Sequence, residues 1–91
     1  MNNKQTRTLK LIFRDPVPSN IPWMDIEQVF FALGGKISEG RGSRVRVSLN
    51  GVFAVFHRPH PEKVTDKGAV KSVRKFLMNA GVVLEEDDVN L

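Results

Sequence analysis

The sequence predicts an α+β fold, in which a three-stranded antiparallel sheet carries helices on one face in the order α-β-β-β-α, plus an additional N-terminal helix. Within residues 42–61, polar and apolar side chains alternate over 44–49 before Asn50-Gly51, and a run of β-branched and aromatic residues follows it, a pattern typical of a β-hairpin. Residues 22–33 and 67–80 repeat apolar side chains at helical spacing. A chain of 91 residues is expected to form one small domain.

The hairpin is the most strongly predicted element. Asn-Gly tolerates the positive φ angles of a two-residue type I′ turn, and the alternation assigns side chains to opposite faces. One face of the incoming strand is expected to hold Arg44, Arg46 and Ser48, with Val45, Val47 and Leu49 on the other. The outgoing strand is expected to divide Phe53, Val55 and His57 from Val52, Ala54 and Phe56.

Three helices and one further strand complete the expected order. A first helix is predicted over 6–14, a second from Pro22 to Gly34-Gly35, and a third over 67–80. Residues 36–39 are expected to form a short strand. The aromatic rings of Trp23 and Phe31 are expected to extend the apolar face of the second helix and lie in the core.

This order, without the first helix, is the pattern of a double-stranded-RNA-binding-like domain. We therefore expect an N-terminal helix and linker over 1–20, the domain itself over 21–82, and an acidic tail over 83–91 that carries four consecutive acids. The sequence contains no membrane-spanning apolar run and no cysteine, so a soluble cytoplasmic protein is expected.

Positive charge is concentrated in the middle of the chain. Residues 36–75 hold ten Lys and Arg against three Asp and Glu, whereas the whole chain has a net charge of +4. Such a block suits a polyanion such as nucleic acid, although many basic surfaces bind none. The predicted RNA-binding residues are Gly42, Ser43, Arg46, Arg58, Lys67 and Lys71.

The hairpin also carries groups that could cleave RNA without a metal or cofactor. A base removes the proton of the 2′-OH, that oxygen attacks the phosphorus, and an acid protonates the leaving 5′-oxygen; histidine suits both tasks. Arginine suits the charge that builds on the phosphoryl oxygens. We therefore predict His57, His60 and Arg44 as catalytic, although either histidine could instead be structural. A pair of histidines without a clear carboxylate partner is a weak metal site.

Short motifs extend across residues 9–82 and resemble one known family in combination. They include Trp23-x-x-Ile26-Glu27, Glu39-Gly40-x-Gly42-Ser43-Arg44, Leu49-Asn50-Gly51, Phe56-His57-Arg58-Pro59-His60-Pro61, Lys67-Gly68-Ala69-Val70 and Ala80-Gly81-Val82. Together they resemble the HicA family, and more closely a longer branch of it with an extra N-terminal helix. The resemblance implies the toxin of a type II toxin–antitoxin pair, an mRNA interferase that a HicB antitoxin inhibits by covering its active face.

One position departs from the family pattern. In short members the proposed catalytic histidine follows a Gly-Ser pair, whereas here Arg44 follows Gly42-Ser43. Three interpretations stay open: the acid–base work has moved to His57 or His60, Arg44 acts electrostatically alone, or this branch cleaves poorly. The alternative function is a non-catalytic RNA-binding module on the same fold, and a DNA-binding helix-turn-helix is a weaker third.

Overall fold

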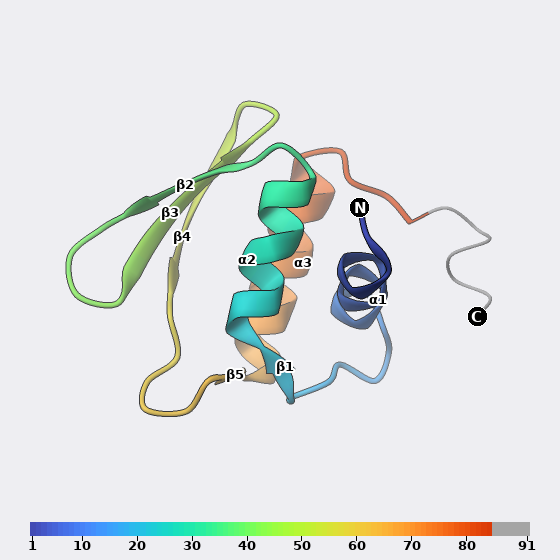
Figure 1. The fold of residues 1–91 in the computed structure, drawn as a ribbon, viewed down its shortest axis with the longest axis horizontal. Helices are drawn as coiled ribbons and strands as arrows, with labels where there is room; N and C mark the ends of the chain where they lie inside the picture. The colour runs from blue at the N-terminus through green and yellow to red at the C-terminus, as the bar shows by residue number, and fades with distance from the viewer. Residues whose placement is uncertain (85–91) are drawn as a thin grey trace.

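The computed structural model describes residues 1–84 and confirms the α+β architecture (Figure 1). A three-stranded antiparallel sheet has the order β2-β3-β4, and a separate two-stranded sheet pairs β1 with β5. No helix among residues 1–84 has the length and apolarity needed to cross a membrane. The elements are α1 (Asn3–Ile12), β1 (Ile21–Pro22), α2 (Trp23–Ala32), β2 (Lys36–Glu39), β3 (Arg44–Leu49), β4 (Val52–His57), β5 (Val64–Thr65) and α3 (Lys67–Asn79).

The β3–β4 hairpin forms as predicted. Asn50 and Gly51 both have positive φ angles, 51° and 80°, as a type I′ turn requires. The Asn50 side-chain amide also donates to the Ala80 carbonyl oxygen at 2.8 Å, which ties the turn to the end of α3. The expected faces are confirmed, because Val45, Val47 and Leu49 are buried while the arginines between them are exposed.

Two helices cover the apolar face of the sheet. Figure 1 shows α2 in front of α3, with both helices between the sheet and α1, so that the molecule has three layers. Four buried aromatic rings join the first two layers. Phe56 of β4 lies 5.7 Å, between ring centroids, from each of Trp23, Phe30 and Phe76. Edge and offset contacts of this kind stabilise a core beyond the area that they bury.

Helix α1 begins earlier than the sequence analysis predicted. Asn2 and Gln5 form a capping box, in which each side chain accepts a hydrogen bond from the other residue's backbone N–H, so the helix spans 3–12 rather than 6–14. Leu9 and Ile12, three residues apart on one side of the helix, are buried. The carboxyl end of α1 is held by Arg74 of α3, which donates to the carbonyl oxygens of Ile12 and Arg14 and pairs with Asp15.

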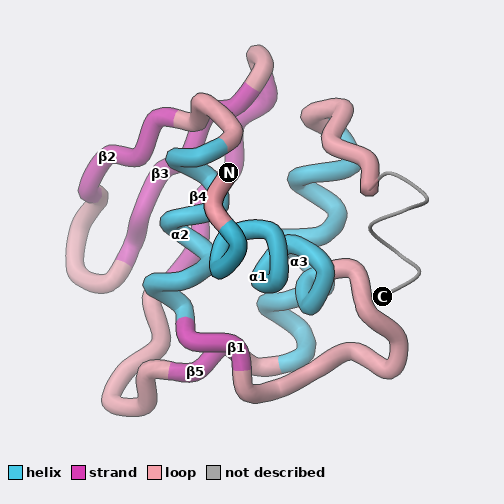
Figure 2. Tube along the Cα trace, turned by 45° about the vertical axis from the view of Figure 1, so that its right-hand side comes forward, coloured by secondary structure: helices cyan, strands magenta, loops and turns pink. Residues whose placement is uncertain are grey.

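Two further expectations need correction, and one lies outside the described residues. Phe31 is 55% exposed rather than part of the core, because the buried stripe of α2 passes through Phe30 instead. Pro22 is the N-cap of α2 and pairs with Val64, rather than being the first helical residue. The four consecutive acids of the expected tail lie in 85–91, outside the residues that the structure describes (Figure 2).

Arg74 provides a test of how α1 is docked. We expect Arg74→Ala to lower the free energy of unfolding by about 1–3 kcal/mol, because it leaves carbonyl oxygens at the end of α1 without their donor. Urea denaturation and amide hydrogen exchange of α1 would measure this effect. Lys75→Ala, on the exposed face of α3, is the matched control and should change little. Equal losses in the two variants would contradict the role assigned to Arg74.

Candidate functional site

The face of the sheet opposite the helices gathers three of the nine predicted site residues, Arg44, Arg46 and His57. In the β3–β4 register, Arg44 lies across from His57, Arg46 from Val55, and Ser48 from Phe53. Directly opposed residues on neighbouring strands share a face, so these three pairs form one continuous row. All except Ser48 are exposed, because the helices pack on the other side of the sheet.

Strand β2 widens this open face and adds a cation. Ser38 pairs with Arg46 and Lys36 with Ser48, so both β2 side chains lie on the open face. Glu39 pairs with the buried Val45 and belongs to the helical side. Within strands β2–β4 the open face therefore holds Lys36, Arg44 and Arg46 and no carboxylate, an arrangement that favours an anionic ligand.

His57 lies at the end of the row, beside the β2–β3 loop. The Oγ of Ser43 is 3.5 Å from the Nδ1 of His57, at the limit of a hydrogen bond, which directs Nε2 away from the loop. The backbone N–H of Arg58 donates to the Ser43 carbonyl oxygen at 2.9 Å and extends the ladder past β4. Gly42, the other predicted loop residue, has a φ of 59°, a conformation that favours glycine.

Gly40 allows the same loop to fold closely against β3. A Cβ at Gly40 would lie 2.9 Å from the Cβ of Arg44, and the Gly40 N–H donates to the Arg44 carbonyl oxygen. A side chain at this position would therefore require Arg44 or the loop to shift, so the close packing of the loop depends on this glycine.

Arg58 has protein partners rather than an open position on the face. Its guanidinium donates two hydrogen bonds to the buried carboxylate of Glu27, at 2.8 and 3.0 Å, and contacts Glu39 at 2.7 Å. Hydrogen bonding to Glu27, then to Glu39, raises the pKa of Arg58 above its usual range, so the side chain stays charged. Trp23 donates its indole N–H to the same Glu27 carboxylate. Because the positive charge of Arg58 is already paired with the carboxylates of Glu27 and Glu39, Arg58 should attract an anionic ligand less strongly than Arg44 or Arg46.

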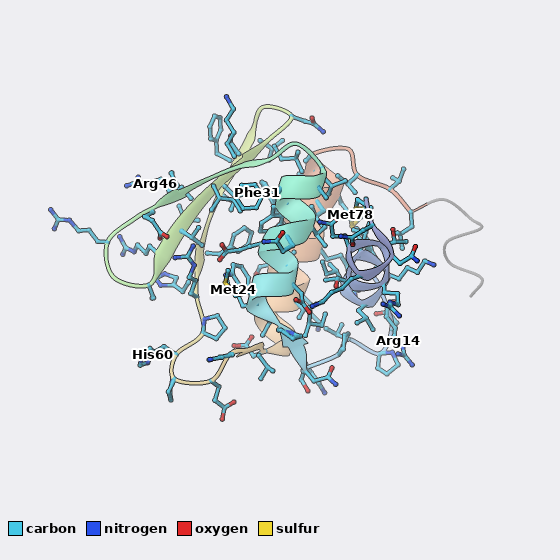
Figure 3. All side chains as sticks on the ribbon, in the orientation of Figure 1. Arg14, Met24, Phe31, Arg46, His60 and Met78 are labelled. Atoms are coloured by element: carbon cyan, nitrogen blue, oxygen red, sulfur yellow. The ribbon has the colours of Figure 1, made fainter. Side chains whose placement is uncertain are left out.

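The remaining predicted residues lie away from the row. His60 is exposed in the loop after β4, and Figure 3 shows it well removed from Arg46. Lys67 and Lys71 are exposed on the first turns of α3, which packs on the helical side of the sheet. The structure therefore brings Arg44, Arg46, Ser43 and His57 together and leaves these three outside the group. Their predicted roles are untested.

A groove on the open face contains residues that the site prediction did not include. It has a volume of about 440 Å³ and is lined on its polar side by Lys36, Ser38, Arg46 and Ser48. Phe53 and Val55 supply its apolar side and are 80% and 55% exposed. The strand alternation had already placed Phe53 and Val55 on the same face as His57, so the signal was present in the sequence. Among residues 1–84, no cluster of three or more His, Cys, Asp or Glu could hold a metal ion.

Comparison with known proteins places this site within a matched domain. The sequence model of the family described as HicA toxin of bacterial toxin–antitoxin matches residues 23–82. The match runs from the start of α2 to just beyond α3 and contains all three strands of the larger sheet, whereas α1 lies outside it. No curated protein and no solved structure matches the chain.

Substitution of the buried Glu27 tests how much its pairing with Arg58 stabilises the fold. Glu27→Gln should lower the free energy of unfolding by about 1–3 kcal/mol, because the amide NH₂ that replaces one carboxylate oxygen cannot accept a hydrogen bond from Arg58. Glu39→Gln is the matched control and should cost less than about 1 kcal/mol, since Glu39 is largely exposed. Urea denaturation followed by Trp23 fluorescence would measure both. Equal costs would show that burial of Glu27 does not matter.

Proposed function

Because the HicA toxin model matches residues 23–82, well over half of the chain, this protein belongs to the HicA toxin family of bacterial toxin–antitoxin systems, and from this we propose its function. We propose that it is a metal-independent endoribonuclease that acts on messenger RNA. The reaction surface is the open face of β2–β4. The observation that carries this proposal is the cross-strand pair of Arg44 and His57, both exposed and flanked by Ser43.

The same pair accounts for the departure from the family pattern. The resemblance implies a histidine directly after Gly-Ser in short members, and that position is Arg44 here. His57 lies directly across the ladder from Arg44, with Cα atoms about 4.5–5.5 Å apart in such pairs. An imidazole on β4 can therefore reach the space that a histidine on β3 would occupy. This favours His57 over His60 as the group that moves the proton.

The proposed reaction uses the open-face residues in separate roles. Nε2 of His57 accepts the proton of the ribose 2′-OH, and the 2′-oxygen attacks the adjacent phosphorus. The P–O5′ bond breaks, leaving a 2′,3′-cyclic phosphate, and the 5′-oxygen takes a proton from water. Arg44 and Arg46 stabilise the negative charge on the phosphoryl oxygens during this step. A substrate without the 2′-OH, such as DNA, cannot react by this route.

A second candidate function is RNA binding without cleavage. It is favoured by the presence of Arg44 where the resemblance implies a catalytic histidine, and by the absence of a second imidazole beside His57 in the described part of the chain. Lys36, Arg44 and Arg46 would then contact phosphates on the same face. The two functions share a surface and differ only in what happens to bound RNA.

The proposed partner is a HicB-like antitoxin that covers the open face. The opposite side of the sheet is filled by α2 and α3, whose outer surface is in turn covered in part by α1, so masking the exposed strands is the direct way to block the site. An acidic partner segment would complement Lys36, Arg44 and Arg46.

His57 and His60 give a matched pair of variants for testing the reaction. We expect His57→Ala to slow cleavage of single-stranded RNA by about 10²–10⁴-fold, because the reaction loses its general base. His60→Ala, the other exposed histidine, should cleave at close to the wild-type rate. The assay contains EDTA and scores 2′,3′-cyclic phosphate ends.

Three results of this assay have distinct meanings. Wild-type cleavage that is unaffected by His57→Ala would contradict the role of His57. Loss of cleavage only in His60→Ala would move the chemistry to the loop after β4. Intact RNA in every sample, together with salt-dependent binding, would select the non-catalytic function.

The antitoxin proposal predicts competition for one surface. A preformed complex of this protein with a HicB-like antitoxin should fail to bind an RNA that the free protein binds, because both ligands need Arg44, Arg46 and His57. Electrophoretic mobility at fixed salt would measure this. A stable ternary complex would show that the antitoxin leaves the open face uncovered.

A further inference from the structure

We propose that Phe53 is a stacking platform for one base of a single-stranded RNA, and that the groove beside it, with Ser38, Ser48 and Lys36, receives that base. The proposal rests on the function proposed above, because it takes RNA as the ligand of the open face. It adds a position at which the protein contacts a base rather than the phosphate backbone.

Phe53 is exposed in a way that the fold does not require. Its side chain is 80% exposed although it lies in a strand, while Phe30, Phe56 and Phe76 fill the core on the other side. The ring borders the groove of about 440 Å³, across from Ser48. An exposed aromatic ring beside a groove offers a flat surface of the kind on which bases stack.

The surroundings of Phe53 favour RNA over a protein ligand. Lys36 and Arg46 line the same groove, and strands β2–β4 place no carboxylate on this face. The hydroxyl groups of Ser38 and Ser48 can donate to or accept from the edge of a base. A base inside a duplex is already stacked and paired, so this arrangement selects an unpaired nucleotide.

The position of Phe53 along β4 separates base binding from the reaction. Phe53 and His57 are four residues apart on one strand and face the same side, a separation of roughly 13 Å. Val55, across from Arg46, lies between them. The stacked base therefore belongs to a nucleotide near the cleaved bond but not at it. We expect Phe53 to act on affinity, and so on KM, rather than on kcat.

The experiment measures binding of the full-length protein to a 2′-O-methyl oligonucleotide, which cannot be cleaved through its 2′-oxygen, by fluorescence anisotropy at several salt concentrations. Phe53→Leu should weaken binding by about 5- to 150-fold, the range expected for loss of one stacked base, whereas Phe53→Trp should retain the affinity. Phe31→Leu, which replaces an aromatic ring of α2 that is 55% exposed, is the matched control and should have no effect.

The salt dependence identifies which contact was lost. Phe53→Leu should leave the slope of log affinity against log salt unchanged, because phosphate contacts are intact, while Arg46→Ala should reduce it. The same oligonucleotide annealed to its complement should bind the wild-type protein more weakly. Circular dichroism and thermal unfolding would verify that each variant is folded, as expected for a change at an exposed position.

Each contrary result has a defined meaning. Wild-type affinity in Phe53→Leu would overturn the stacking role, as would equal binding of single-stranded and duplex RNA. A Phe53→Leu variant that loses only antitoxin binding would make this groove a protein contact and would also overturn it. A wild-type protein that binds no RNA at any salt concentration would instead remove the proposed function itself.

Discussion

The buried carboxylate of Glu27 is the contact on which the geometry of the open face depends. It lies on α2, 3% exposed, and accepts hydrogen bonds from Trp23 on its own helix and from Arg58 beyond β4. A buried carboxylate without such partners would cost several kcal/mol. Because Arg58 also contacts Glu39 of β2, one network joins α2 to both edge strands of the sheet. The backbone of His57, the residue before Arg58, is thereby positioned beside Ser43.

The one-sided packing of the sheet comes from the aromatic core between strands and helices. Aromatic rings of α2, α3 and β4 fill the space between helices and strands, so the alternate residues of β3 and β4 face outward, and these include the apolar Phe53 and Val55. Helix α1 then covers part of the outer surface of α2 and α3 (Figure 2). Hydrogen bonds from Arg74 to the carbonyl oxygens of Ile12 and Arg14 hold its carboxyl end. The cationic strand face is left open, with guanidinium, imidazole and aromatic groups in a single row.

Local sequence patterns predicted most of the secondary structure and the two faces of the hairpin. The Asn50-Gly51 turn, the strand alternation and the helical stripes depend on neighbours in sequence, and the structure confirms them. The pairing of Arg58 with Glu27 joins residues 31 positions apart, so composition indicated only a free cation there. Phe31 was assigned to the core because a stripe of apolar residues does not show where its edge meets solvent. The prediction also left His57 and His60 unseparated, although a two-residue turn at Asn50-Gly51 fixes the register that places His57 across from Arg44.

The central claim is that RNA is bound and cleaved on the open face of β2–β4. Its most direct test is a nuclear magnetic resonance titration of the protein with a single-stranded RNA whose 2′-oxygens are methylated. The account predicts that the largest shifts fall on Lys36, Ser38, Arg44, Arg46, Phe53 and His57, with α1 and the outer face of α3 unchanged. Shifts confined to Lys67, Lys71 and the loop around His60, with strands β3 and β4 unaffected, would contradict it.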